Sequence, residues 1–122
     1  MIHVLFIEDD ALITKVVLRF FRSSYPDAVV SHVDNYQRAV DCLEAIQFDL
    51  VLSDFDLAPG TRGSGGSVLT WIEKNQPRLK SRFIFLSAND ASGERGVPWL
   101  EKPCSNSDLA MTIADVLKRN NT

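Results

Sequence analysis

The stretch 50-LVLSDFDLAPG-60 joins a short apolar run to two aspartates and then to a proline and a glycine. Leu50 to Ser53 predicts a strand that is buried on both faces, because largely apolar runs without alternation are typical of strands inside a parallel sheet. Asp54 ends this run, and Asp56 follows two residues later. A carboxylate is costly to bury without a partner. The stretch therefore predicts a functional site at the end of an interior strand.

Similar short apolar runs recur along the chain and alternate with helical patterns. Besides 50–53, strands are expected at 3–7, 28–33, 83–86 and 97–100. Between and after them, apolar residues repeat with the helical period of 3.6 residues. The expected inward positions are Leu12, Ile13, Val16, Val17, Phe20 and Phe21 in the first helix, Ala39, Val40, Leu43 and Ile46 in the second, Val68, Leu69 and Ile72 in the third, and Leu109, Ile113, Val116 and Leu117 in the last.

Polar residues and a proline mark the expected helix ends. Asn35 is expected to cap the second helix, and Pro77 to stop the third. Ser105 with Asp108 predicts a capping box at the start of the last helix. Strands that alternate with helices predict an α/β domain with a parallel sheet and helices on both faces. The 122 residues show no repeat or linker, so residues 1–122 are expected to form a single domain.

The composition narrows the class of protein. Hydrophobic residues make up 45% and charged residues 24%, a balance typical of a globular domain. The net charge of −3 argues against direct nucleic-acid binding. The apolar runs are too short to span a membrane, and the start, MIHVLFIEDD, does not resemble a signal peptide. Cys42 and Cys104 are expected to be reduced, so we expect a cytoplasmic protein.

Charged and polar side chains follow four of the five expected strands. They are Glu8, Asp9 and Asp10 after the first, Asp54 and Asp56 after the third, Ser87 after the fourth, and Lys102 with Pro103 after the fifth. Ligands of parallel α/β sheets bind at the carboxyl ends of the strands. We therefore expect these side chains to meet in one cleft. Taken alone, the turn 8–10 could equally be a solvated acidic cap of the first helix.

The grouping indicates phosphoryl transfer onto an aspartate. Crowded carboxylates repel one another unless a cation neutralises them. Mg²⁺ suits such a site because it binds carboxylates and shares phosphate oxygens. Lys102 supplies a positive charge and Ser87 a hydroxyl donor for a phosphoryl group. Asp54 is the expected nucleophile, which would form an aspartyl phosphate.

In this order, the residues resemble the receiver domain of two-component response regulators over nearly the whole chain. The matching positions are the acidic pair Glu8 and Asp9, the phosphoacceptor Asp54, Ser87 followed by Ala88, and Lys102–Pro103, whose peptide bond is cis in the family. The resemblance implies a flavodoxin-like, doubly wound sheet of five parallel strands in the order 2-1-3-4-5. It also implies a signalling phosphoacceptor rather than an enzyme with a separate substrate.

The resemblance implies roles and partners as well. A sensor histidine kinase or a histidine phosphotransfer protein would supply the phosphoryl group, and a downstream effector domain or protein would read the result. Mg²⁺, with Mn²⁺ as an expected substitute, would be bound by Glu8, Asp9, Asp54 and the backbone carbonyl of Asp56. Asp56 and Asn89 match positions that tune hydrolysis of the phosphoaspartate.

A switch is implied at Ser87 and at Trp99, the aromatic residue three positions before Lys102. An alternative stays open, in which Trp99 only covers the exposed side of the fifth strand. The chain departs from the family in two places. The segment 87-SANDASGERG-96 lacks an apolar stripe, so the helix between strands four and five is expected to be shortened or absent. The segment 57-LAPGTRGSGG-66 is longer than usual and is either a gate for the kinase or a plain insertion.

Two other functions compete with the receiver. Haloacid-dehalogenase-like phosphatases carry Asp-x-Asp after a strand, which SDFDLA matches with Asp54 as nucleophile and Asp56 as acid/base. Their second acidic pair follows the lysine, whereas Glu8 and Asp9 precede it here, so chain order disfavours the phosphatase. A pseudo-receiver that acts only as a protein-interaction module would have lost site residues, and none of the expected ones is missing from the sequence.

Overall fold

A computed structural model describes residues 1–55, 64–89 and 93–119 of the chain. The strands are β1 (His3–Ile7), β2 (Val29–Val33), β3 (Leu50–Asp54), β4 (Phe83–Ser87) and β5 (Trp99–Glu101). The helices are α1 (Ala11–Ser24), α2 (Tyr36–Ala45), α3 (Ser64–Asn75) and α4 (Asn106–Arg119), and two short 3-10 segments are η1 (Pro77–Arg82) and η2 (Glu94–Gly96). Within the described ranges, no helix is long and apolar enough to cross a bilayer.

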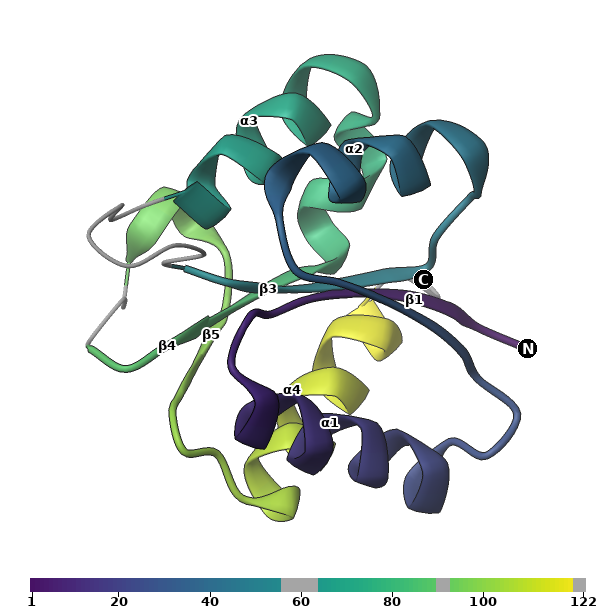
Figure 1. Cartoon of the computed structure of the whole chain (residues 1–122), viewed down its shortest axis with the longest axis vertical. Coiled ribbons are helices and arrows are strands. Elements are labelled where there is room, and N and C mark those ends of the chain that lie inside the picture. The colour runs from purple at the N-terminus through teal and green to yellow at the C-terminus, as the bar shows by residue number, and fades with distance from the viewer. Residues whose placement is uncertain (56–63, 90–92, 120–122) are drawn as a thin grey trace.

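The strands form one parallel sheet in the order β2-β1-β3-β4-β5, which confirms the expected topology. Helices α2 and α3 cover one face of the sheet, and α1 and α4 cover the other (Figure 1). Strand β3 lies in the middle, between β1 and β4, and all five of its residues are buried. Residues 50–54 are therefore an interior strand, as their apolar run predicted.

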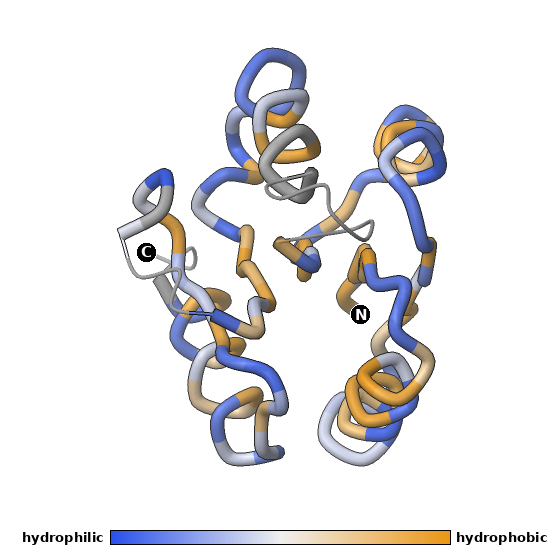
Figure 2. Tube along the Cα trace, turned by 60° about the vertical axis from the view of Figure 1, so that its left-hand side comes forward, coloured by the Kyte–Doolittle hydropathy of each residue, from blue (hydrophilic) through white to orange (hydrophobic). Residues whose placement is uncertain are grey.

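Two hydrophobic clusters hold the helices on the sheet. Side chains alternate between the faces of a strand, so Val4 and Phe6 of β1 join the cluster with α1 and α4, while Leu5 and Ile7 join the cluster with α2 and α3. Figure 2 shows the largely hydrophobic strands in the middle, with helices that mix hydrophobic and hydrophilic residues around them. Each fully buried aliphatic or aromatic side chain contributes roughly 1.5–3 kcal/mol. This burial fixes the strands whose ends carry the site.

Side-chain caps define where three helices begin. Asp10, Asn35 and Ser105 each accept a hydrogen bond from the backbone N–H three residues further on, at 2.9, 2.9 and 3.1 Å. These bonds satisfy amide groups that have no partner inside the helix. The predicted cap at Asn35 is confirmed, and of the capping box predicted at Ser105 and Asp108 the bond to Ser105 Oγ is present. Helix α3 ends at Asn75, just before Pro77.

Two inward positions were predicted wrongly. Leu12 is 70% exposed, because the buried stripe of α1 runs through Val17, Phe20 and Phe21, and Leu12 lies at its margin in the first turn. Ile46 follows the last residue of α2 as its C-terminal cap and is 38% exposed. The 3.6-residue period marks the side of a helix that is buried, but it does not show where along the helix the packing partners end.

The connection from β4 to β5 is short of helix, as expected. In its described part, 88–89 and 93–98, the short turn η2 takes the place of a helix. Gly93, Arg95 and Gly96 have φ values of 81°, 55° and 70°, a left-handed conformation that is uncommon for a residue with a Cβ. Arg95 donates a hydrogen bond to Thr70 of α3 (3.1 Å) and pairs with Glu73 of the same helix. The polar contacts of Arg95 and the buried side chain of Val97 thus both hold this segment against the α3 side of the sheet.

Candidate functional site

The candidate site lies at the carboxyl ends of four neighbouring strands, β1, β3, β4 and β5. Glu8 and Asp9 follow β1, Asp54 ends β3, and Ser87 ends β4. Lys102 follows β5, and its backbone N–H donates to the Ser87 carbonyl oxygen at 2.8 Å. The parallel register thus brings the ends of β1, β3, β4 and β5 to one edge of the sheet.

Lys102 lies between two buried carboxylates. Its Nζ is 2.8 Å from Asp54 Oδ1 and 2.8 Å from Glu8 Oε1. Asp54 is 4% exposed and Glu8 is fully buried, whereas Asp9 is exposed. One carboxylate oxygen from each of Glu8, Asp9 and Asp54 lies within 4.8 Å of the others. With all groups ionised, three carboxylates and one ammonium leave a formal charge of −2 at this edge.

The electrostatics of the pair follow from its burial. Burial raises the pKa of Glu8 to about 7; the hydrogen bond from Lys102 opposes this rise, and the charge of Asp54 adds to it. Burial alone would lower the pKa of Lys102, but its hydrogen bonds to Asp54 and Glu8 raise that pKa above its ordinary value. The ammonium therefore stays charged, and it is one cation beside three carboxyl groups.

The donor set fits a hard divalent cation. Three carboxylate oxygens at one point are ligands that Mg²⁺ prefers, and a cation there would offset their repulsion. The structure also separates the acidic turn into two parts, because Glu8 and Asp9 lie in the cluster while Asp10 caps α1. The backbone carbonyl of Asp56, the fourth expected ligand, lies outside the described residues.

The remaining predicted residues surround this cluster. Ser87 is 2% exposed, and its Oγ accepts a hydrogen bond from the Asn89 backbone N–H at 3.2 Å. The Asn89 side chain is exposed. The Lys102–Pro103 peptide bond is cis. The side chain of Ser87 is thus already in contact with the segment that leads toward η2.

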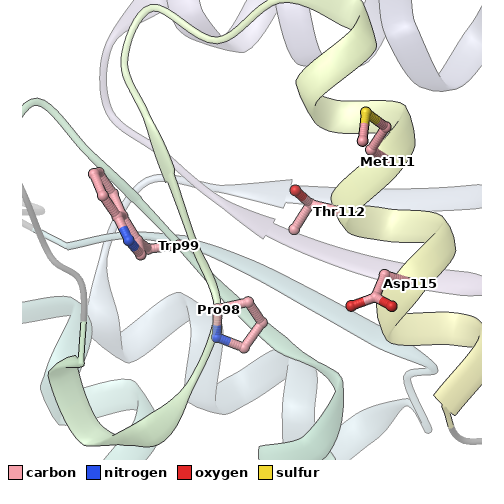
Figure 3. A pocket seen from close by; sticks show the side chains of 5 residues that line it. All are labelled: Pro98, Trp99, Met111, Thr112 and Asp115. Atoms are coloured by element: carbon pink, nitrogen blue, oxygen red, sulfur yellow. The ribbon is translucent and has the colours of Figure 1, made fainter.

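Trp99 is half-buried and packs against the hydrophobic cluster under α2 and α3. Trp99 is also one of the residues that line an open groove of about 620 Å³ between β5 and α4, although its ring points away from α4 (Figure 3). The other residues that line the groove are Pro98, Met111, Thr112 and Asp115. These contacts agree with both interpretations of Trp99, a covering residue and a moving one.

Sequence reasoning missed one contact of the acidic turn. His32 of β2 has its Nε2 2.9 Å from the backbone carbonyl oxygen of Glu8. A signal was available, because the expected order 2-1-3-4-5 places the end of β2 beside the end of β1. The exact partner depends on the strand register, in which Phe6 pairs with His32.

Comparisons with known proteins agree with this geometry. The family model of the response regulator receiver domain matches residues 4–114. No curated protein matches the chain in sequence. The signal receiver domain of a Luxo repressor protein from Vibrio parahaemolyticus superposes with a TM-score of 0.82 at 24% identity, over 98% of this chain and 92% of that one. The chemotaxis response regulator CheY4 of Vibrio cholerae gives a TM-score of 0.77 at 21% identity, over 96% and 99% of the two chains.

At these identities the solved structures show a shared fold, and the family match carries the assignment. The matched residues, 4–114, include Glu8, Asp54 and Lys102, which converge at the edge of the sheet. This chain belongs to the response regulator receiver domain family.

Proposed function

We propose that this receiver accepts a phosphoryl group on Asp54 from the phosphohistidine of a sensor histidine kinase or a histidine phosphotransfer protein. The domain itself catalyses the step, which depends on Mg²⁺. The observation that carries the proposal is the position of Lys102, whose ammonium contacts Asp54 and Glu8 inside a cluster of three carboxylates. Such a site combines a nucleophile with positive charge for the group that it attacks.

In the proposed step, the phosphoryl group moves from the donor histidine to Asp54. A carboxylate oxygen of Asp54 attacks phosphorus, a P–O bond forms, and the P–N bond to the donor histidine breaks with its electron pair returning to the imidazole. Lys102, which is already beside Asp54 Oδ1, offers a fixed charge to the phosphoryl oxygens. Ser87 offers a hydroxyl donor from the end of the neighbouring strand. Transfer of this kind is catalysed mainly by positioning and by neutralising charge.

Glu8, Asp9 and Asp54 would hold the Mg²⁺, and we include the backbone carbonyl of Asp56 as a further ligand. The chemistry that the ion supplies is neutralisation of charge on the carboxylates and the phosphoryl oxygens. Mn²⁺ takes the same oxygen ligands and is proposed as a substitute.

We further propose that the switch runs from Ser87 to Trp99. Ser87 Oγ holds the Asn89 backbone N–H, so a turn of the hydroxyl toward a phosphoryl group would release the first residues of the β4–β5 segment. Trp99 lies at the other end of that segment and would repack in response. The side chains of Asp56 and Asn89 are proposed to set the lifetime of the phosphoaspartate. This is a local change of charge that biases a two-state element.

We place the receiver, as a single domain over residues 1–122, in the cytoplasm with its kinase. A downstream effector domain or protein would read the switched state. The domain binds neither nucleic acid nor membrane in this scheme. Its only chemistry is its own phosphorylation and dephosphorylation.

The test is incubation of the protein with acetyl phosphate and Mg²⁺, followed by mass spectrometry of the intact chain and of its peptides. We expect one added phosphoryl group, on the peptide that contains Asp54, and none without Mg²⁺. Asp54→Asn is the matched control, because it keeps the shape and loses the nucleophile. No adduct on the wild-type protein would favour the pseudo-receiver, and sustained turnover of phosphate esters would favour the phosphatase.

A further inference from the structure

The acidic turn is tied to the neighbouring strand by a histidine. His32 Nε2 lies 2.9 Å from the backbone carbonyl oxygen of Glu8, and the His32 ring packs on Phe6 with 5.3 Å between the ring centroids. A carbonyl oxygen only accepts hydrogen bonds, so the proton of this bond is on Nε2. His32 therefore donates from β2 to the first residue after β1.

Thr14 forms a second tie at the other end of the turn. Its Oγ1 donates to the Asp10 carbonyl oxygen at 2.7 Å, which uses the hydroxyl proton. Thr14 Oγ1 also lies 3.5 Å from His32 Nε2. Because the single Nε2 proton is donated to the Glu8 carbonyl, this second contact is weak. His32 thus holds the carbonyl group of Glu8 and Thr14 holds that of Asp10, on either side of Asp9.

Two further hydrogen bonds also restrain the acidic turn. The Glu8 backbone N–H donates to the Val33 carbonyl at 3.0 Å, and Glu8 Oε2 accepts from the Asp10 backbone N–H at 3.2 Å. The N–H and the carbonyl of Glu8 are thereby both fixed to β2. Without such restraints, the carboxylates of this turn would move apart from Asp54, because like charges repel in a buried site.

We propose that His32 is a positioning residue for the divalent-cation site. Its Nε2–H bond to the Glu8 carbonyl holds Glu8 and Asp9 so that their carboxylates meet that of Asp54. This inference rests on the proposed function, since it concerns the same site. It adds a role for a β2 residue that touches neither the cation nor the phosphoryl group.

Two substitutions separate the hydrogen bond from the ring. His32→Phe keeps the aromatic contact with Phe6 and removes the donor, whereas His32→Gln removes the ring and keeps an N–H donor at similar reach. We measure the Mg²⁺ dissociation constant by titration calorimetry and, in metal-free protein, the hydrogen exchange of the Asp9 and Asp10 amides. His32→Phe is expected to weaken Mg²⁺ binding by about five- to tenfold, as the loss of one hydrogen bond predicts, and to speed the exchange of both amides.

His32→Gln is expected to bind Mg²⁺ within about twofold of the wild-type protein, because the donor is restored. His3→Phe is the matched control, since His3 begins β1 at the opposite end of the sheet and is expected to change neither readout. If His32→Phe fails to fold, Thr14→Val replaces it and is expected to change both readouts in the same direction, by less.

Weaker Mg²⁺ binding in His32→Gln than in His32→Phe would overturn the proposal, because ring packing would then be the cause. Unchanged Mg²⁺ binding in His32→Phe, or no Mg²⁺ binding in the wild-type protein, would overturn it as well. Neither readout uses phosphorylation. A wild-type protein that binds Mg²⁺ but takes no phosphoryl group on Asp54 would sink the proposed function and leave this inference intact.

Discussion

Two ion clusters in this receiver mirror each other. At the functional edge, one cation, Lys102, lies between two carboxylates, Glu8 and Asp54. On the outer side of α3, one carboxylate, Glu73, lies between two cations, Lys80 and Arg95. The same chemical groups serve different ends in the two places. The difference lies in their burial and in which charge is in excess.

Burial decides how strongly each cluster departs from ordinary behaviour. The Lys102 side chain is 13% exposed and that of Glu8 is fully buried, whereas the Glu73 side chain is 32% exposed. The pKa of Glu8 rises to about 7 because burial outweighs its contact with Lys102. The pKa of Glu73 falls, chiefly through its hydrogen bond from Lys80. The buried cluster thus has unbalanced negative charge that a cation would satisfy, while the outer cluster has its charge partners already.

The largest effect is expected at Lys102. Lys102→Met leaves Glu8 and Asp54 facing each other without their shared cation, and breaking a buried pair in this way costs about 3 kcal/mol. We expect a loss of that order in the unfolding free energy of metal-free protein at pH 8, together with loss of phosphorylation by acetyl phosphate. Urea denaturation measures the first effect and mass spectrometry the second.

Lys74→Met is the control for this prediction. Lys74 is an exposed lysine in the last turn of α3, where the same change of side chain should cost little. Equal losses of unfolding free energy in Lys102→Met and Lys74→Met would mean that the buried ion pair adds no more to stability than an exposed lysine. That result would contradict the comparison between the two clusters.

The next effect is a pH dependence that comes from Glu8. Because the pKa of Glu8 is about 7 in the folded protein and its ordinary value, expected in the unfolded chain, is 4.5, the folded state binds the proton more tightly. The unfolding free energy of metal-free protein should therefore fall as pH rises from about 4.5 through about 7, by up to about 3 kcal/mol. Glu8→Gln should remove this fall, and saturating Mg²⁺ should reduce it. Urea denaturation at pH 5 and pH 8 measures all three.

A fall of the same size in Glu8→Gln would assign the pH dependence to another group. Asp10→Asn is the matched control here, because Asp10 caps α1 outside the carboxylate cluster. That variant should keep the fall in unfolding free energy between pH 5 and pH 8.

The smallest effect is expected in the outer cluster. Arg95→Asn removes the contacts with Glu73 and Thr70 while keeping a residue that tolerates a left-handed backbone. Exposed ion pairs contribute little and are screened by salt. We expect faster hydrogen exchange at the amides of 94–97, nearly unchanged global stability, and a smaller difference from wild type at high salt.

Glu73→Gln should act in the same way and also report on pH. Since the folded pKa of Glu73 lies below its ordinary value, its contribution is present above the unfolded pKa of about 4.5 and is lost as pH falls through the folded pKa. Exchange at 94–97 should therefore differ between Glu73→Gln and wild type at neutral pH and converge in acid. A global unfolding transition shifted as far as that of Lys102→Met would contradict the ranking of the two clusters.

Local pattern was enough to predict the α/β fold class and the residues at the sheet edge, whereas the strand order was implied by the family resemblance. The buried run before Asp54 predicted an interior strand, and alternating strands and helices predicted a parallel sheet, whose carboxyl ends must share one edge. Glu8, Asp9, Asp54 and Lys102 followed from that topology, and the structure brings them together. The shortened helical segment after Ser87 was predicted from the lack of an apolar stripe.

Contacts between distant segments were beyond the reach of local pattern. His32 contacts the Glu8 carbonyl because β2 pairs with β1 in the register that places His32 beside Phe6. Arg95 contacts Glu73 because the β4–β5 segment lies against α3. Leu12 was misplaced for a similar reason, since periodicity does not say where packing ends. The sequence by itself determined which residues stand at the strand ends, because strand and helix periods are local properties of the chain. Only the tertiary structure decided which side chains hold one another in place, because burial, register and the distance between charges exist only in the packed molecule.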